Sequence, residues 1–117
     1  PENVALTLPS SVSASVRERC YTPDVIAAET ALRYTEATES LDKLRHHLRV
    51  STFVNRYKTK NVKGQVPNTR TREVMHQIDI KIWASYRRYR HARERHLNLV
   101  GEGGWMDILR PLEKSDV

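Results

Sequence analysis

The side chains that most often bind metals or act as nucleophiles occur here without the spacing those tasks need. The chain has five histidines and one cysteine. His46 and His47 are adjacent, so on a helix they point about 100° apart, and His91 and His96 are five residues apart, not the four that two ligands on one helix face need. No base can be identified beside Cys20, so we expect a half-buried structural thiol. We therefore expect no metal site and no cofactor.

Acidic residues and glycines do not point to catalysis either. The carboxylates are scattered, without a recurring pair suited to acid–base work, and Lys63-Gly64-Gln65 contains one glycine, which does not make a phosphate-binding loop. We expect the chain by itself not to be an enzyme. It begins at Pro1 and not at Met, and we interpret it as a piece of a longer protein whose remainder would hold any activity.

Positive charge is concentrated in one stretch, residues 43–72, which holds nine basic residues and no acidic one. In contrast, residues 1–42 hold three basic and seven acidic residues. Contacts between such cations and phosphates are sensitive to salt and do not read sequence. The residues we predict to contact a nucleic-acid backbone are Arg49, Arg56, Lys58, Lys60, Lys63, Arg70 and Arg72.

Two other interpretations of the positive charge stay open. Basic residues near a helix C-terminus complement its dipole, which accounts for Arg56 and Lys58 but not for Arg70 and Arg72 at the start of the next helix. The formal net charge of +6 is also within the range that keeps small domains soluble.

A second basic run interleaves arginine with aromatic residues between Tyr86 and Arg95. Arginines and aromatic rings together can bind single strands by stacking. However, Tyr86 and Tyr89 lie on the apolar face predicted for their helix. We therefore favour core tyrosines with solvated arginines between them, some of which would pair with Glu29, Glu36 or Glu39 on an opposing helix.

The elements that position these residues are two long helices. Thr22 and Pro23 are suited to the N-cap and the first helical position, and apolar residues then recur at spacings of three and four, which predicts a helix over 23–57. The predicted apolar row comprises Val25, Ala28, Leu32, Tyr34, Ala37, Leu41, Leu44, Leu48, Phe53, Val54 and Tyr57.

A second helix is predicted over 68–100, after a polar connector at 58–67 that contains Gly64 and Pro67. Gly101 is its stop signal. Its predicted seam alternates spacings of three and four: Met75, Ile78, Ile82, Ser85, Tyr89, Ala92, His96 and Leu99.

These elements predict an all-α fold: an antiparallel hairpin of two long helices, with a lead-in at 1–22 and a short terminal segment at 101–117 that carries a short helix. Two helices alone expose too much apolar surface. Either the chain ends cover the seam, or a second copy completes a dimeric four-helix arrangement. Residues 43–72 then form one end of the hairpin, which we call the basic tip.

Composition agrees with helices and limits the setting. Only 4 Gly and 5 Pro are present, fewer than a sheet rich in turns would require. A single cysteine allows no internal disulfide, which favours a reducing intracellular compartment. No apolar stretch approaches the roughly 18 residues of a membrane-spanning helix, so we expect no membrane partner.

The order of several motifs provides a further indication. They are Leu6-Thr7-Leu8-Pro9-Ser10, Glu29-Thr30-Ala31-Leu32-Arg33, residues 37–45, Asn68-Thr69-Arg70-Thr71-Arg72, Tyr86-Arg87-Arg88-Tyr89-Arg90, and residues 105–112. This order resembles the helical C-terminal region of fungal KDZ (Kyakuja–Dileera–Zisupton) transposases and their domesticated relatives. The resemblance implies a nuclear setting, DNA as the eventual partner and an accessory role. The acidic catalytic core of such transposases would lie upstream, and none of it is present here.

Two functions therefore remain in competition. The first is an accessory, non-catalytic domain of a transposase-like protein that contacts the DNA backbone through the basic tip. The alternative is a module that dimerises, or docks on the rest of its parent protein, without touching nucleic acid. That alternative predicts an apolar row, including Trp83 and Tyr86, left open in the monomer.

Overall fold

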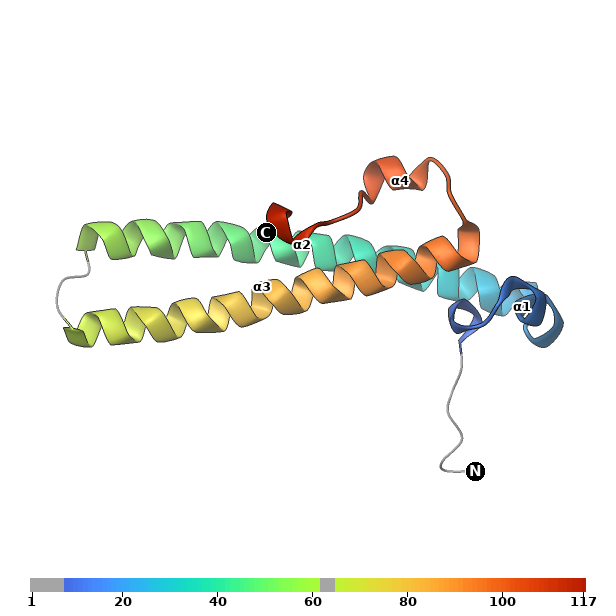
Figure 1. Ribbon diagram of the computed structural model, residues 1–117, viewed down its shortest axis with the longest axis horizontal. Helices are drawn as coiled ribbons and strands as arrows, with labels where there is room; N and C mark the ends of the chain where they lie inside the picture. Colours follow the sequence, from blue (N-terminus) through green and yellow to red (C-terminus); the bar gives the residue numbers. More distant parts are fainter. Residues whose placement is uncertain (1–7, 62–64) are drawn as a thin grey trace, which may run out of the picture.

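The computed structural model describes residues 8–61 and 65–117, and every regular element within these ranges is helical. Two long helices, α2 (Pro23–Asn61) and α3 (Gln65–Val100), run antiparallel along a molecule of 64 × 39 × 20 Å (Figure 1). The short elements are η1 (Pro9–Ser11), α1 (Ala14–Cys20), α4 (Trp105–Ile108) and η2 (Lys114–Asp116). The predicted all-α hairpin is confirmed.

Helix α2 begins where the sequence predicts and ends later. The hydroxyl of Thr22 accepts a bond from the amide of Val25 at 3.4 Å, and Pro23 occupies the first helical position. The helix continues to Asn61 instead of ending near 57, because nothing in residues 58–61 interrupts it. The hydroxyl of Thr59 donates to the carbonyl of Asn55 in the preceding turn.

The predicted connector at 58–67 is therefore too long, and residues 62–64 within it lie outside the described range. Helix α3 begins at Gln65, not at 68, and includes Pro67 in its first turn. A proline is tolerated there because the first amides of a helix have no partner within the helix. At the other end, Gly101 adopts a φ of 70° and its amide bonds the carbonyl of Leu97 at 2.8 Å, as a C-terminal glycine stop requires.

The two long helices pack through two buried clusters. The first comprises Ala37, Tyr89, Ala92 and Leu109, and the second comprises Leu44, Ile78 and Ile82. Small residues, including Ala37, Ser40 and Ala92, are buried where the helices meet, which lets the helices approach closely. The predicted seam of α3 is confirmed, since all its members are buried or half-buried.

The predicted apolar row of α2 is only partly right. Tyr34, Ala37, Leu41, Leu44 and Leu48 face the core, whereas the following members are exposed: Val25, Ala28, Leu32, Phe53 and Tyr57. At about 100° per residue, Phe53 lies about 180° around the helix from Leu44, and Leu32 about 120°. A row that follows spacings of three and four loosely over many turns drifts around the helix and leaves the core.

Polar contacts attach the N-terminal segment to the hairpin. The amide and hydroxyl of Ser10 donate to the buried carboxylate of Glu29 at 2.9 and 2.7 Å. The buried guanidinium of Arg17 donates to the carbonyls of Pro9, Val12 and Asn98. Burial alone would raise the pKa of Glu29, but bonds from Ser10 and Arg33 outweigh it and hold this pKa below its ordinary value.

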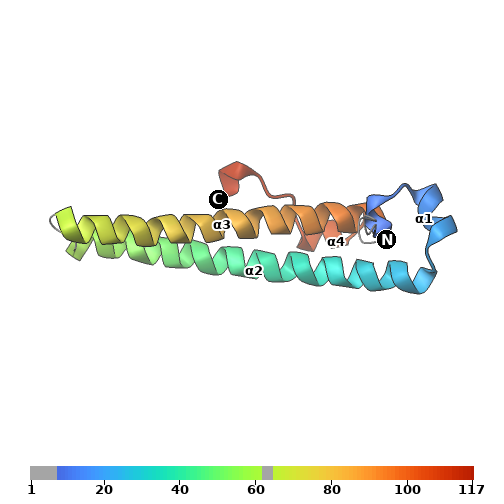
Figure 2. The same cartoon turned by 90° about the horizontal axis from the view of Figure 1, so that it is seen from below.

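The C-terminal segment also packs on the hairpin. In Figure 1, α4 lies above the two long helices and η1 below them, and Figure 2 shows the long helices side by side along their length. Leu109 is buried against Tyr89, whose hydroxyl donates to the carbonyl of Arg110 at 2.6 Å, and Leu112 packs against both clusters. The segments 8–22 and 101–117 therefore dock on the hairpin, as one of the two predicted solutions requires.

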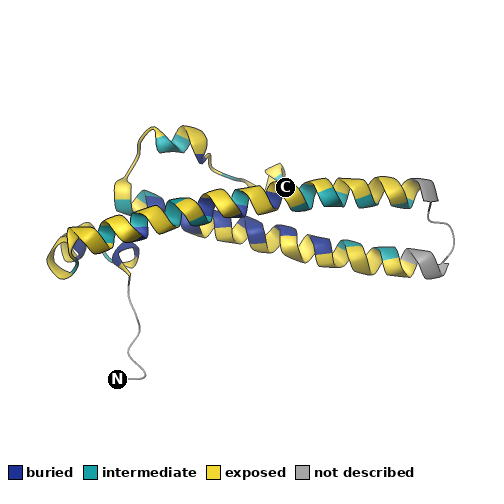
Figure 3. Ribbon diagram, turned by 180° about the vertical axis from the view of Figure 1, so that it is seen from behind, coloured by how far each residue is buried: buried dark blue, intermediate teal, exposed yellow. Residues whose placement is uncertain are grey.

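The outermost turns of the hairpin remain a pair of helices without such cover (Figures 1 and 3). No residue is buried between Arg45 and Thr59 of α2, or between Thr69 and Gln77 of α3. This end of the molecule is the basic tip.

Candidate nucleic-acid interface

The predicted site residues whose side chains are described lie on both helices of the basic tip. Arg49 and Arg56 are exposed on α2, and Lys58 is half-buried there. Arg70 and Arg72 are exposed in the first turns of α3. Residues 60–68 have no described side chains, so the predictions for Lys60 and Lys63 lie outside what the structure describes. The hairpin thus brings together cations that are separated in sequence by up to 23 positions.

Half-buried apolar residues hold these two helices together. Leu48 and Val54 of α2 and Met75 of α3 pack against the cluster around Leu44. The hydroxyl of Thr52 donates to the carbonyl of Leu48. The core side of the tip is thereby occupied, and Arg49 and Arg56 are presented to solvent.

Carboxylates neutralise arginines elsewhere in the molecule but not these. Arg33 pairs with Glu29 at 2.9 Å and with Glu36 at 3.0 Å, and Arg88 reaches Glu36 at 3.3 Å. Within the basic tip, the ion pair found among the described residues is that of Arg45 with Asp42 at its border, 3.5 Å long and exposed to solvent. Exposed pairs of that kind contribute little, so the tip keeps its positive charge.

The environment of His47 shows the same positive field. Burial lowers the pKa of His47, and the charges of His46, Lys81 and Lys43 lower it further. His46 and His47 have ring centroids 5.5 Å apart, but no group of three or more His, Cys, Asp or Glu side chains in the described part of the chain is placed to hold a metal ion.

The second basic run serves the fold. Tyr86 and Tyr89 are buried, which confirms the prediction of core tyrosines. Arg90 donates to the hydroxyl of Tyr86 at 2.9 Å, and Arg93 donates to the carbonyl of Leu109 at 2.8 Å. Arg93 therefore holds the C-terminal segment on α3, and Arg90 holds the ring of Tyr86 in place on α3. For this reason we do not assign this run to the interface.

Two further expectations concern Cys20 and membrane-spanning helices. Cys20 is exposed at the end of α1, and not half-buried as predicted. None of the described helices is both long enough and apolar enough to cross a bilayer.

Sequence reasoning missed two residues of the basic tip. Phe53 and Tyr57 were assigned to the core, yet they are exposed on α2 between the cations. Helical phase separates both residues from the side of the helix that carries Ala37 and Leu44, but it does not say which side meets α3.

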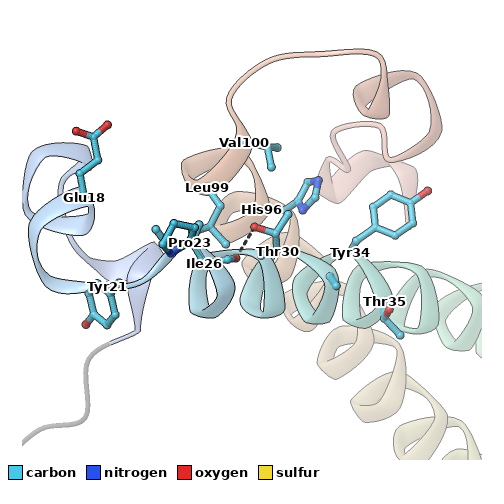
Figure 4. Close-up of a pocket in the computed structure, with 12 residues that line it drawn as sticks. Glu18, Tyr21, Pro23, Ile26, Thr30, Tyr34, Thr35, His96, Leu99 and Val100 are labelled. Carbon is cyan, nitrogen blue, oxygen red and sulfur yellow. Dashed lines mark hydrogen bonds between the residues drawn. The ribbon is translucent and has the colours of Figure 1, made fainter.

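An apolar groove of about 830 Å³ lies at the opposite end of the hairpin, between α1, the start of α2 and the end of α3 (Figure 4). His96 borders it and is buried against Trp105, with ring centroids 4.6 Å apart. The Nδ1 atom of His96 has no hydrogen-bond partner among the residues that the structure describes. Burial lowers the pKa of His96, and the Thr30 carbonyl opposes this only in part.

The lowered pKa of His96 predicts loss of stability in mild acid. Below about pH 6.5 the unfolded chain takes up the proton more readily than the folded chain. The free energy of unfolding should therefore fall as the pH drops from about 6.5 to the lower pKa of the folded state, and then level off. Urea unfolding of the wild type at pH 8 and pH 5.5 should show this loss, and His96→Phe should reduce it. A His47→Gln control removes the other histidine with a lowered pKa; an unchanged pH dependence in His96→Phe would refute the assignment.

Comparisons of this chain with protein-family models, curated proteins and solved structures find no match.

Proposed function

We propose that this chain is a non-catalytic helical module that contacts a nucleic-acid backbone through its basic tip. The observation that carries the proposal is the arrangement of Arg49, Arg56, Lys58, Arg70 and Arg72 at one end of the hairpin. Within the described residues, none of these five side chains has an ion-pair partner. The 43–72 stretch holds no carboxylate to provide one.

Two arginines of α3 support this choice of partner. Arg70 and Arg72 are the sixth and eighth residues of α3, beyond the first turn in which the helix dipole acts. The dipole therefore explains the presence of neither residue. Both side chains are exposed and have no ion-pair partner among the described residues, and a phosphate would supply one.

The kind of nucleic acid and the setting follow from the resemblance described above. The motif order similar to the C-terminal region of KDZ transposases supports DNA as the partner, the nucleus as the compartment and an accessory role in a larger transposase-like protein. The contact we propose uses phosphates, and it therefore gives affinity without sequence preference.

Binding of a short DNA duplex, followed by fluorescence anisotropy at increasing salt, tests the proposal. The logarithm of the association constant should fall linearly with the logarithm of the salt concentration, by about 0.9 for each phosphate contact. Four simultaneous contacts would give a slope of about −3.6. Duplexes of unrelated sequence should bind alike. An affinity that does not change with salt would refute the proposal.

A second candidate function, docking on another protein or on a second copy, is favoured by one observation. Ile80 and Trp83 are 49% and 37% exposed on α3. They are three residues apart, so they share one helix face. Tyr86, which this alternative also requires to be open, is buried. This function predicts a molecular mass that rises with concentration and returns to that of the monomer in Trp83→Ala.

A further inference from the structure

Two aromatic side chains stand in solvent on the outer face of α2. Phe53 is 70% exposed and Tyr57 is 53% exposed. They are four residues apart, so their rings are neighbours along one side of the helix, about 6 Å apart along its axis. Phe53 is on the side opposite Leu44, and packing against α3 cannot account for either ring.

Arginines flank these rings on the same side of α2. Arg49 precedes Phe53 by four residues and Arg56 follows it by three, which are the spacings of neighbours on a helix surface. Both arginines are exposed. The face therefore alternates cation, ring, cation and ring along about two turns, with no carboxylate in the surrounding stretch 43–72.

We propose that this face binds single-stranded nucleic acid, with unpaired bases stacked on Phe53 and Tyr57 and phosphates held by Arg49 and Arg56. The inference rests on the proposed function and narrows it, because it assigns a preference for unpaired strands to one face of the basic tip. Aromatic rings accept any base, since every base has a flat π-face, and neighbouring cations hold the backbone.

The spacing favours an unpaired strand over a duplex. Successive phosphates of one strand in B-form DNA advance by about 3.4 Å along the helix axis, whereas the two rings are about 6 Å apart. Bases that stack on both rings must therefore be drawn apart from each other. The bases of an intact duplex are paired and stacked inside it, so a duplex offers these rings only its backbone.

Charge argues against a second copy of this chain as the occupant. A symmetric dimer places the same patch on both sides of its interface. Arg49 and Arg56 would then face their own counterparts, and the basic tip has no acidic residue to balance them. An anionic strand complements the same face.

The test compares an oligothymidylate of roughly 16 nucleotides with a duplex of equal length, each bound to the full chain. Replacing both rings, Phe53→Ala with Tyr57→Ala, should weaken oligothymidylate binding by about 5- to 150-fold for each ring lost. Duplex affinity should change by less than about twofold, because duplex binding uses the cations. A Phe53→Leu, Tyr57→Leu variant keeps the apolar surface without the flat ring and should show a similar loss.

The control is a Leu32→Ala, Ile80→Ala variant, which removes two exposed apolar side chains elsewhere and should leave both affinities unchanged. The inference is overturned if the ring variants bind oligothymidylate as the wild type does, and the proposed function stands if the duplex still binds with its salt dependence. It is also overturned if the ring variants only abolish self-association. Failure of the wild type to bind either probe would overturn both.

Discussion

Replacing Leu44 by alanine should lower the free energy of unfolding by about 2–5 kcal/mol. Leu44 is 2% exposed and packs between α2 and α3 with Ile78 and Ile82. Alanine removes buried methylene and methyl groups and leaves a cavity that its neighbours fill only in part. Urea unfolding followed by circular dichroism at 222 nm measures the effect.

The matched control is the same substitution at Leu32, which is 68% exposed on the same helix. Leu32→Ala should change the free energy of unfolding by no more than about 0.5 kcal/mol. Both variants replace leucine by alanine within α2, so the change in helix propensity is the same and cancels in the comparison. Equal effects at the two positions would show that the face of α2 that meets α3 is wrongly assigned.

These two leucines also show that the sequence does not suffice to predict which face of α2 packs against α3. The spacing of apolar residues predicts the existence of both long helices, and the seam of α3 is regular enough to be assigned correctly residue by residue. In α2 the same reasoning places Leu32 and Phe53 beside Leu44. Apolar residues occur on more than one side of α2, and spacing alone does not decide which side meets the partner helix.

A buried carboxylate explains part of the error in the apolar row predicted for α2. Near the start of α2, the position that faces inward is Glu29, which a reader of the sequence would place in solvent. Its burial depends on Ser10, 19 residues earlier, and on Arg33 one turn later. This cluster forms only when η1 docks on the hairpin, so the local sequence around Glu29 does not predict that its carboxylate is buried.

The residues of the candidate interface also fall into two groups, those that the sequence predicts and those that only the structure shows. The acid-free stretch of cations can be found by counting charges, and the hairpin then brings Arg56 and Arg70 to one end. The exposure of Phe53 and Tyr57 could not be found from composition, because aromatic residues are more often buried. Only the packing of α2 against α3 shows that these rings are left exposed among the described residues.

The central claim is that the position of the cations, and not the total charge, makes the basic tip a phosphate-binding surface. A pair of variants separates the two. The tip variant replaces four exposed arginines by glutamine: Arg49, Arg56, Arg70 and Arg72. The control variant replaces four exposed basic residues elsewhere: Arg19, Arg87, Arg110 and Lys114. Each loses four charges from a chain of formal net charge +6, so both end with the same net charge.

Duplex affinity of the two variants, measured side by side at about 0.1 M salt, is the most direct measurement. The tip variant should bind on the order of 10²–10³-fold more weakly than the wild type, and its salt slope should be smaller by about 3.6. The control variant should stay within a few-fold of the wild type. Equal losses in both variants, or a larger loss in the control, would contradict the assignment of the basic tip.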